Sequence, residues 1–198
     1  MKSSQLPISD IKKCAKMCKD VYGLKRDWQV RETSDTTFLA IEGTDSVEDW
    51  KTNFAFLFRS DDTHRGFRKN AWRVFFEMFE ADVFRHIPKD KHIVVTGHSL
   101  GGATAIVLAD MLDNVFDNVE VVTFGSPRPG GRGLRKRMKG TPITRYVHGS
   151  DVVPKSPPWI CGYVHPCECN HLTDTQKQRF DGVKDHSMSE YIKALDSL

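Results

Sequence analysis

Apolar positions along this chain follow two different spacings, one typical of helices and one typical of buried strands. Residues 8–22 carry apolar side chains at helical spacing, and residues 67–87 are rich in Phe, Val and Met and end at Pro88, which predicts two helices. Residues 28–32 and 37–42 are short runs divided by turn-forming residues, which predicts two strands. The first half of the chain therefore mixes both kinds of element.

The rest of the chain continues this alternation. Further strands are predicted at residues 54–60, 92–96, 119–124 and 143–147, and further helices at residues 103–111, 130–139 and 185–196. Strands that alternate with helices imply a largely parallel sheet covered by helices on both faces. Because no linker, internal repeat or low-complexity tract interrupts the 198 residues, we predict one α/β domain that spans residues 1–198.

Composition narrows the class of function. With 39% hydrophobic and 28% charged residues, the chain has the balance of an ordinary globular protein. A formal net charge of +3 is too small to indicate nucleic-acid binding, and no nucleic-acid motif accompanies the basic run at residues 132–139. That run is typical of a solvated helix face, and the alternative is a transient attraction to an anionic lipid surface.

The amino terminus and the cysteines bear on the compartment. Residues 1–20 contain no apolar core of a signal peptide, and no stretch approaches the 18 apolar residues of a transmembrane segment. Five cysteines cannot all pair within one monomer, which fits a reducing compartment better than a disulfide scaffold. A cytoplasmic location is the default expectation, export by another route stays open, and the oligomeric state is not indicated.

A G-x-S-x-G pentapeptide stands between the strand predicted at 92–96 and the alanine-rich helix that follows it. In a strand-to-helix elbow the serine takes a strained backbone conformation, so the residues two positions before and after it must be small. Such a turn exposes the serine Oγ at a helix N-terminus, where free amides favour the negative charge of acyl transfer. Ser99 is therefore the candidate nucleophile, and a capping serine in an ordinary turn is the alternative. The pentapeptide is Gly97, His98, Ser99, Leu100 and Gly101.

A serine nucleophile needs a base to remove its proton and a carboxylate to orient that base. On this type of sheet the order along the chain is serine, acid, histidine. Asp151 follows the strand predicted at 143–147, at the edge where open α/β sheets bind ligands, and His186 begins the last predicted helix. A turn aspartate and a solvent-facing histidine are the structural alternatives. The other downstream candidates are His148, His165 and His171 as bases, and Asp110, Asp113, Asp117, Glu120, Glu168, Asp174, Asp181, Asp185 and Glu190 as acids.

Further segments match one family pattern in the right order, from about Ile11 to Tyr191. His64-Arg65-Gly66-Phe67 resembles the motif that opens the family's long helix, and Asp151-Val152-Val153-Pro154 resembles its acid loop. The other matching segments are Ile41-Glu42-Gly43-Thr44, Ser46-Val47-Glu48-Asp49-Trp50, Thr123-Phe124-Gly125-Ser126-Pro127-Arg128, Pro157-Pro158 and Gly162-Tyr163-Val164-His165. On these residues the chain resembles the class 3 lipases, the fungal triacylglycerol lipase-like branch of the α/β-hydrolases.

The resemblance implies a complete serine hydrolase site. It makes Ser99 the nucleophile, Asp151 the acid and His186 the base, and it places the oxyanion hole at the backbone amides of Thr44 and Leu100. The implied function is a carboxylic-ester hydrolase that cleaves acylglycerols or related lipid esters, with no cofactor and no metal. Phospholipase A1, a feruloyl-type esterase and an acyltransferase are alternatives within this class. A catalytically silent hydrolase fold that serves as a binding module is the alternative outside it.

Two departures from the family pattern, together with a short lid-like segment, affect the expected activity. Glu42 stands where an arginine is usual, beside the oxyanion strand. The stretch between Asp151 and His186 and the region before the oxyanion strand are shorter than in the secreted fungal enzymes. The lid-like segment at residues 46–52 is short and polar, with Trp50 as its main apolar residue. We therefore expect an open acyl groove, weak interfacial activation and activity on dispersed or short-chain esters.

A cluster of potential metal ligands lies near the carboxyl terminus. Its spacing differs from the paired cysteines and paired histidines of a zinc finger. His165 also falls where the lipase family has a strand histidine. We therefore expect free thiols in a loop of the hydrolase fold rather than a zinc site. The cluster is Cys161, His165, Cys167, Cys169 and His171.

Overall fold

The computed structural model describes residues 6–43, 59–60, 62–172 and 182–198. Thr44, the lid-like segment at 46–52 and most of the strand predicted at 54–60 lie outside these residues. The helices are α1 (Ile8–Asp20), α3 (Arg65–Glu80), α4 (Leu100–Leu112), α5 (Arg132–Arg137) and α6 (Met188–Asp196). The strands are β1 (Trp28–Glu32), β2 (Thr36–Ile41), β3 (Arg59–Ser60), β4 (Thr63–His64), β5 (His92–His98), β6 (Val119–Phe124), β7 (Ile143–Val147) and β8 (Asn170–His171). Single 3₁₀ turns are η1 (Val21–Gly23), η2 (Val153–Lys155), η3 (Trp159–Cys161) and η5 (Lys184–His186).

The main sheet has the strand order β1-β2-β5-β6-β7-β8. Strand β1 pairs with β2 in antiparallel fashion, and every other described pair in this sheet is parallel. The predicted parallel sheet is therefore confirmed, with one antiparallel edge strand. Because β5, β6 and β7 run in the same direction, the chain leaves all three at the same edge, and this carboxyl edge is where the predicted site residues follow.

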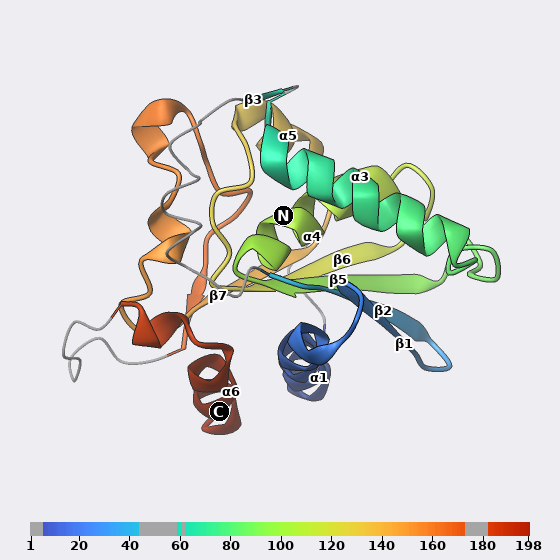
Figure 1. Cartoon of the computed structure of the whole chain (residues 1–198), viewed down its shortest axis with the longest axis horizontal. Coiled ribbons are helices and arrows are strands. Elements are labelled where there is room, and N and C mark those ends of the chain that lie inside the picture. The colour runs from blue at the N-terminus through green and yellow to red at the C-terminus, as the bar shows by residue number, and fades with distance from the viewer. Residues whose placement is uncertain (1–5, 44–58, 61, 173–181) are drawn as a thin grey trace.

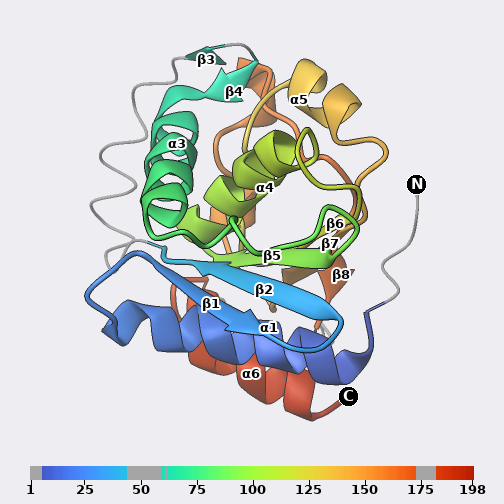
Figure 2. The same cartoon turned by 90° about the vertical axis from the view of Figure 1, so that its right-hand side faces the viewer.

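Helices cover both faces of the sheet, as predicted. Figure 2 shows α1 and α6 together on one face and α3, α4 and α5 on the other, and Figure 1 shows the same layers edge-on. Alternate residues of β2 divide between the two cores, as the period of a strand requires. Leu39 and Ile41 join the core under α3 and α4, whereas Phe38 and Ala40 join the core under α1 and α6. The fold is the α/β-hydrolase type expected from the sequence.

Helix α3 is shorter than predicted and ends at Glu80 rather than at residue 87. Its last turn closes as a Schellman motif, in which the Asp82 amide bonds the Phe79 carbonyl and the Val83 amide bonds the Met78 carbonyl. Asp82 takes the left-handed conformation that this motif needs, with φ of 57°. The apolar residues beyond it, which extended the predicted helix, pack in a turn. Pro88 therefore does not end the helix.

The last helix also begins later than predicted. Residues 185–187 belong to η5 and the cap of α6, where the Ser187 side chain accepts a hydrogen bond from the Ser189 amide. His186 is consequently the last residue of a 3₁₀ turn and not part of the helix. The basic helix predicted at 130–139 is present as the shorter α5.

Among the described residues, no helix combines the length and apolar character needed to cross a membrane.

Candidate active site

Ser99 occupies the turn between β5 and α4. Its φ of 54° and ψ of −130° lie in a region that non-glycine residues rarely adopt, and only 4% of its surface is exposed. Such a conformation costs about 1–3 kcal/mol and persists only where the surrounding structure enforces it. The strained serine predicted for a nucleophile elbow is therefore present.

The glycines around Ser99 are required by close packing. A Cβ atom on Gly97 would overlap the backbone of Gly101, and one on Gly101 would overlap the carbonyl oxygen of Ile41. A Cβ on Gly102 would lie 2.8 Å from the Cβ of Ser126. Helix α4 therefore approaches β5 and the end of β2 more closely than a residue larger than glycine would permit at these positions.

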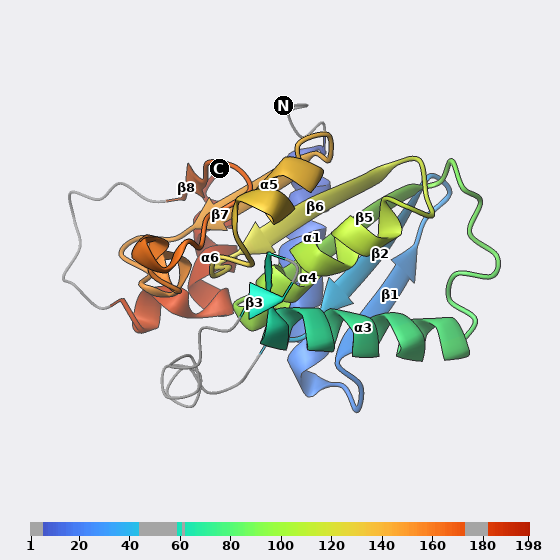
Figure 3. The ribbon, with the colours of Figure 1, turned by 90° about the horizontal axis from the view of Figure 1, so that it is seen from above.

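The three predicted triad residues lie in one line of hydrogen bonds. His186 Nε2 lies 2.8 Å from Ser99 Oγ, and His186 Nδ1 lies 2.8 Å from Asp151 Oδ2. His186 and Asp151 expose only 3% and 1% of their surfaces. Asp151 comes from the loop after β7 and His186 from η5, and Figure 3 shows these segments beyond the same end of the sheet. This is the arrangement in which a histidine takes the serine proton while a carboxylate holds the ring.

Both carboxylate oxygens of Asp151 have donors besides the catalytic pair. Tyr191 Oη donates to Oδ2 at 2.6 Å, and the Val153 amide donates to Oδ1 at 2.9 Å. Because its Oδ1 accepts from the Val153 amide, Asp151 is a turn-forming aspartate, and it is also the partner of His186. The predicted acid and its structural alternative, a turn aspartate, therefore both describe this residue. These contacts occupy both oxygens and fix the orientation of the Asp151 side chain.

A second aspartate joins the loop of the acid to the turn of the base. Asp185 Oδ2 accepts from the Ser150 amide at 2.9 Å and from the Ser150 hydroxyl at 2.7 Å. The neighbouring His148 Nδ1 lies 3.2 Å from the Asp185 carbonyl oxygen. Asp185 and Ser150 directly precede His186 and Asp151, so this contact joins the two segments that carry the predicted base and acid.

Gly125, directly after β6, leaves room for the acid and the base. Its φ is 58°, and a Cβ there would lie 2.7 Å from Asp151 Oδ2 and 3.0 Å from the His186 ring. Gly125 belongs to one of the segments that resemble the family, but the sequence indicates no role for it. Tyr191 and Asp185 were likewise missed as supporting residues, because only the folded loops bring them to the triad.

The oxyanion hole is described on one side only. Leu100 is the first residue of α4, and the first amides of a helix have no acceptor within it. That amide belongs to the same turn as Ser99, as the prediction requires. Thr44, the other predicted donor, lies outside the described residues.

The remaining candidate bases do not contact Ser99 within the described chain. His165 Nε2 lies 2.7 Å from the Pro154 carbonyl oxygen, and His171 Nε2 lies 3.5 Å from Cys169 Sγ. Burial, reinforced by the charge of Arg145, lowers the pKa of His165 to about 3. His165 is therefore a neutral ring that supports the acid loop.

The cysteine and histidine cluster is spread over separate partners. Cys167 Sγ donates to the carbonyl of Ile143 on β7 at 3.4 Å, whereas His165 contacts the carbonyl of Pro154 in η2. All five cysteines are free thiols. In the part of the chain that the structure describes, no three His, Cys, Asp or Glu side chains are grouped to hold a metal ion.

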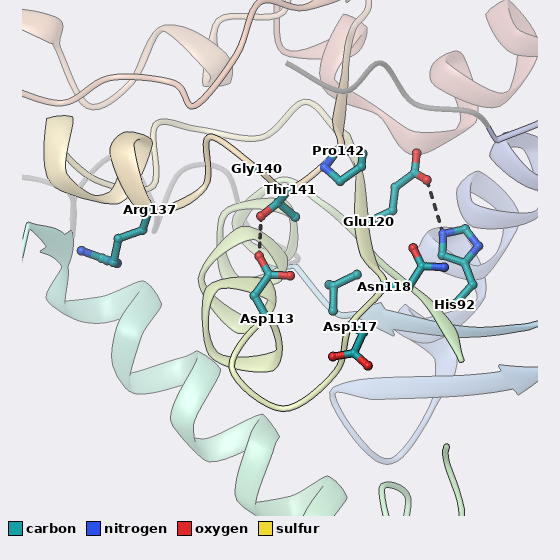
Figure 4. Close-up of a pocket in the computed structure, with 10 residues that line it drawn as sticks. His92, Asp113, Asp117, Asn118, Glu120, Arg137, Gly140, Thr141 and Pro142 are labelled. Carbon is teal, nitrogen blue, oxygen red and sulfur yellow. Dashed lines mark hydrogen bonds and ion pairs between the residues drawn. The ribbon is translucent and has the colours of Figure 1, made fainter. Parts of the chain in front are cut away.

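A cavity of about 510 Å³ lies at the opposite, amino edge of the sheet. It is lined by residues at the starts of β5 and β6 and by the segment before β7. Figure 4 shows the carboxylate of Asp113 on the Thr141 hydroxyl and that of Glu120 toward His92, while the Arg137 side chain extends away from them. This cavity contains three of the other candidate acids, Asp113, Asp117 and Glu120, but none of Ser99, Asp151, His186 and Leu100.

Comparison with known families shows which family this chain belongs to. A family model described as lipase (class 3) matches residues 38–160, more than half of the chain. The chain belongs to the class 3 lipase family. The match begins on β2, includes the whole nucleophile elbow and the Asp151 loop, and ends in η3.

Individual relatives agree with the family assignment. The chain is 29% identical over 162 residues to a lipase of Rhizomucor miehei, a match that covers 74% of this chain and 44% of the relative. It is 34% identical over 173 residues to the secreted mono- and diacylglycerol lipase 1 of Fusarium solani, covering 81% of this chain and 49% of the relative. The chain therefore spans about half the length of the curated relatives it matches.

A solved structure supports the fold. The lipase from Rhizopus microsporus var. chinensis superposes with a TM-score of 0.71 at 24% identity, over 87% of this chain and 76% of that chain. At this identity the likeness concerns the fold. The helix-covered sheet is thus shared with the structure of this lipase.

Proposed function

We propose that this protein hydrolyses carboxylic esters of lipids through an acyl-enzyme on Ser99. The observation that carries the proposal is the line of two 2.8 Å contacts from Ser99 Oγ through His186 to Asp151. Membership of the class 3 lipase family supports an ester as the substrate. All members of the line are nearly buried, so the charges that form during the reaction are poorly screened by water.

In the acylation step, Ser99 Oγ attacks the ester carbonyl carbon while its proton passes to His186 Nε2. The carbonyl oxygen becomes a tetrahedral oxyanion, for which the Leu100 amide and a donor at Thr44 are the proposed partners. Collapse of this intermediate breaks the ester bond, and His186 returns the proton to the leaving alcohol. Asp151 stabilises the imidazolium that exists between these two transfers.

Deacylation repeats the same chemistry with water. His186 Nε2 removes a proton from a water molecule, which attacks the acyl carbon, and Ser99 Oγ leaves with the proton. Every proton in the cycle is thus moved by one histidine. The reaction consumes an ester and water and releases an alcohol and a carboxylic acid, so it calls for no cofactor or metal ion.

Acylglycerols are the proposed substrates. The support is the name of the Fusarium solani relative, a mono- and diacylglycerol lipase, together with that of the Rhizomucor miehei lipase. Phospholipids and feruloyl esters are the alternatives within the same chemistry, because the fold supplies the machinery and the loops select the ester.

The proposal is tested by a substrate series with the purified full chain. We expect hydrolysis of p-nitrophenyl esters and of dispersed mono- and diacylglycerols, with slower release of fatty acid from phosphatidylcholine. Ser99→Ala is the control, since it keeps the fold and removes the nucleophile. Equal rates for wild type and Ser99→Ala would contradict the proposal and favour a silent binding module, whereas faster cleavage of phosphatidylcholine would shift the substrate class.

Contact with a lipid surface forms part of the same proposal. Helix α5 presents Arg135 and Lys136 to solvent, whereas Arg137 is engaged by Asp110 at 2.8 Å. These exposed cations would attract anionic headgroups weakly and reversibly, because surface charges are screened by salt. Sedimentation with phosphatidylserine vesicles at two salt concentrations tests this, and salt-independent binding would contradict it.

A further inference from the structure

His98, the residue directly before the nucleophile, is surrounded by aromatic rings of the site. Its ring centroid lies 4.6 Å from that of His186, with the two planes tilted by 32°. The rings of Tyr22 and Tyr191 approach its edges, with centroid distances of 6.1 Å and 6.0 Å. His98 is 6% exposed, so its polar atoms must find partners inside the protein.

Both ring nitrogens of His98 have such partners. Nε2 lies 2.7 Å from the backbone carbonyl oxygen of His186, and Nδ1 lies 2.9 Å from Tyr22 Oη. A carbonyl oxygen can only accept a hydrogen bond, so Nε2 carries the proton. In the neutral ring Nδ1 is then an acceptor, and the Tyr22 hydroxyl donates to it. The two contacts together select one tautomer of His98.

The neutral state of His98 suits its position beside the base. Burial is the main cause that lowers the pKa of His98 to about 3, and the charge of His186 lowers it further, against the opposing hydrogen bond to the His186 carbonyl. During the proposed reaction His186 becomes an imidazolium each time it takes a proton. A second positive ring at 4.6 Å would oppose that step, whereas a neutral ring does not.

We propose that Tyr22 and His98 form a positioning relay that holds the backbone of the catalytic base. The relay crosses three elements, since Tyr22 lies in η1, His98 ends β5, and His186 ends η5. It rests on the proposed function, because it requires His186 to act as the base. Its task is to keep the His186 ring in line with Ser99 Oγ, where a displacement of about 1 Å can cost roughly 10²-fold in rate.

The strand that leads to the predicted oxyanion donor packs against the same relay. A Cβ atom on Gly43 would overlap Tyr22 Oη and would lie 2.6 Å from the His98 carbonyl oxygen. The relay thus occupies the space between the end of β2, the nucleophile turn and the turn of the base. Together with the Asp185 contact to Ser150, it holds η5 from two sides.

The test compares three substitutions in a soluble p-nitrophenyl ester assay. We expect His98→Leu to lower kcat about 10–100-fold with KM changed less than about threefold, because the base is displaced while the groove is intact. Tyr22→Phe, which leaves Nδ1 without its donor, should lower kcat by roughly 3–10-fold. His98→Gln should recover most of the activity, since its amide N–H can donate to the His186 carbonyl and its amide oxygen can accept from Tyr22.

A matched control separates positioning from stability. Cys18 Sγ of α1, the helix just before η1, lies 3.3 Å from Thr96 Oγ1 of β5, so this contact joins the same part of the chain to the same strand through residues other than Tyr22 and His98. Cys18→Ala should lower the melting temperature as much as Tyr22→Phe and leave kcat unchanged. In the double variant Tyr22→Phe, His98→Leu, the loss should equal that of His98→Leu alone, because the two residues act as one unit.

The outcomes are distinguishable from failure of the proposed function. An inactive wild type would overturn the ester hydrolase itself and the relay with it. With an active wild type, unchanged kcat in His98→Leu would overturn the relay alone. Loss of kcat in proportion to lost stability, in Cys18→Ala as in Tyr22→Phe, would also overturn it.

Discussion

The two edges of the central sheet each carry a histidine next to a carboxylate, but only one of them is organised for chemistry. At the carboxyl edge His186 and Asp151 lie 2.8 Å apart, and at the amino edge His92 and Glu120 lie 3.4 Å apart. Asp151 receives donors on both oxygens, whereas Glu120 Oε1 is buried without a hydrogen-bond partner in the described part of the chain. The other ring nitrogen of His186 lies within hydrogen-bond distance of the Ser99 hydroxyl.

The cavity at the amino edge is sizeable, at about 510 Å³, and holds several acidic groups (Figure 4). Its histidine also approaches a hydroxyl, but Thr36 Oγ1 lies 3.5 Å from His92 Nδ1, whereas Ser99 Oγ lies 2.8 Å from His186 Nε2. The carboxyl edge has a strained serine, close-packed glycines and a ring held at both nitrogens. The comparison teaches that hydrogen bonds which orient a base identify a reactive site better than the number of titratable groups.

The largest expected difference between the edges comes from their carboxylates. Asp151→Asn should lower kcat by about 10⁴-fold, because the amide no longer fixes the His186 tautomer or stabilises its charged form. Glu120→Gln, the matched change at the amino edge, should keep kcat within about twofold. Steady-state ester hydrolysis with both variants measures the difference, and comparable losses would mean that the two edges do not differ in catalytic organisation.

Glycine substitutions test the close packing. Gly101→Ala places a Cβ against the Ile41 carbonyl, a backbone atom that cannot move cheaply, so we expect at least about 1–3 kcal/mol of destabilisation. Gly140, which lines the amino-edge cavity, has no atom within 4 Å of an added Cβ. Gly140→Ala should therefore be neutral or stabilising by up to about 1 kcal/mol. Urea unfolding of both variants measures the change in stability. An unchanged free energy of unfolding in Gly101→Ala would show that the elbow is loosely packed.

The donor on the triad carboxylate has a smaller predicted effect. Tyr191→Phe removes the 2.6 Å bond to Asp151 Oδ2 and should cost about 1–3 kcal/mol of stability, since hydrogen bonds to charged groups exceed neutral ones. Tyr146→Phe, a tyrosine of the same core stacked on Phe124, is the control. A Tyr191→Phe protein as stable as the control would mean that Asp151 does not depend on this donor.

Acid stability provides the mildest test. The pKa of His165 is about 3 in the folded chain, against an ordinary value of 6.5, so the unfolded chain takes up a proton first. This group's contribution is complete above pH 6.5 and is lost as the pH falls toward 3. His165→Gln should therefore make the decline of stability between pH 7 and 5 shallower, whereas exposed His86→Gln should not. Identical slopes in urea midpoints would contradict the burial of a neutral His165.

The strands were predictable because their pattern is local. Runs such as 119–124 and 143–147 are rich in β-branched and aromatic residues and are buried along almost their whole length, and β6 and β7 match them. The end of α3 was missed for the opposite reason. Phe84 and Ile87 are apolar because they pack on the core from a turn, and Asp82 ends the helix without a glycine or proline signal.

The residues of the site also fall into a group that the sequence predicts and a group that it does not. Ser99 follows from a contiguous motif with a steric reason for each glycine, and the placement of Asp151 and His186 follows from chain order on this type of sheet. Tyr191, Asp185 and the partners of His98 could not be predicted, because each reaches the triad across a sequence separation that only the folded loops bridge. His98 was part of the predicted pentapeptide, but nothing in the sequence indicates what its ring contacts.

The central claim is that Ser99 is the one activated nucleophile, at the carboxyl edge of the sheet. The most direct measurement is reaction of the folded chain with a fluorophosphonate, followed by mass spectrometry of its peptides. We predict a single phosphonyl adduct on the peptide that contains Ser99, none in Ser99→Ala and much slower labelling in Asp151→Asn. A folded wild type without an adduct, or one labelled equally after Ser99→Ala, would contradict the account.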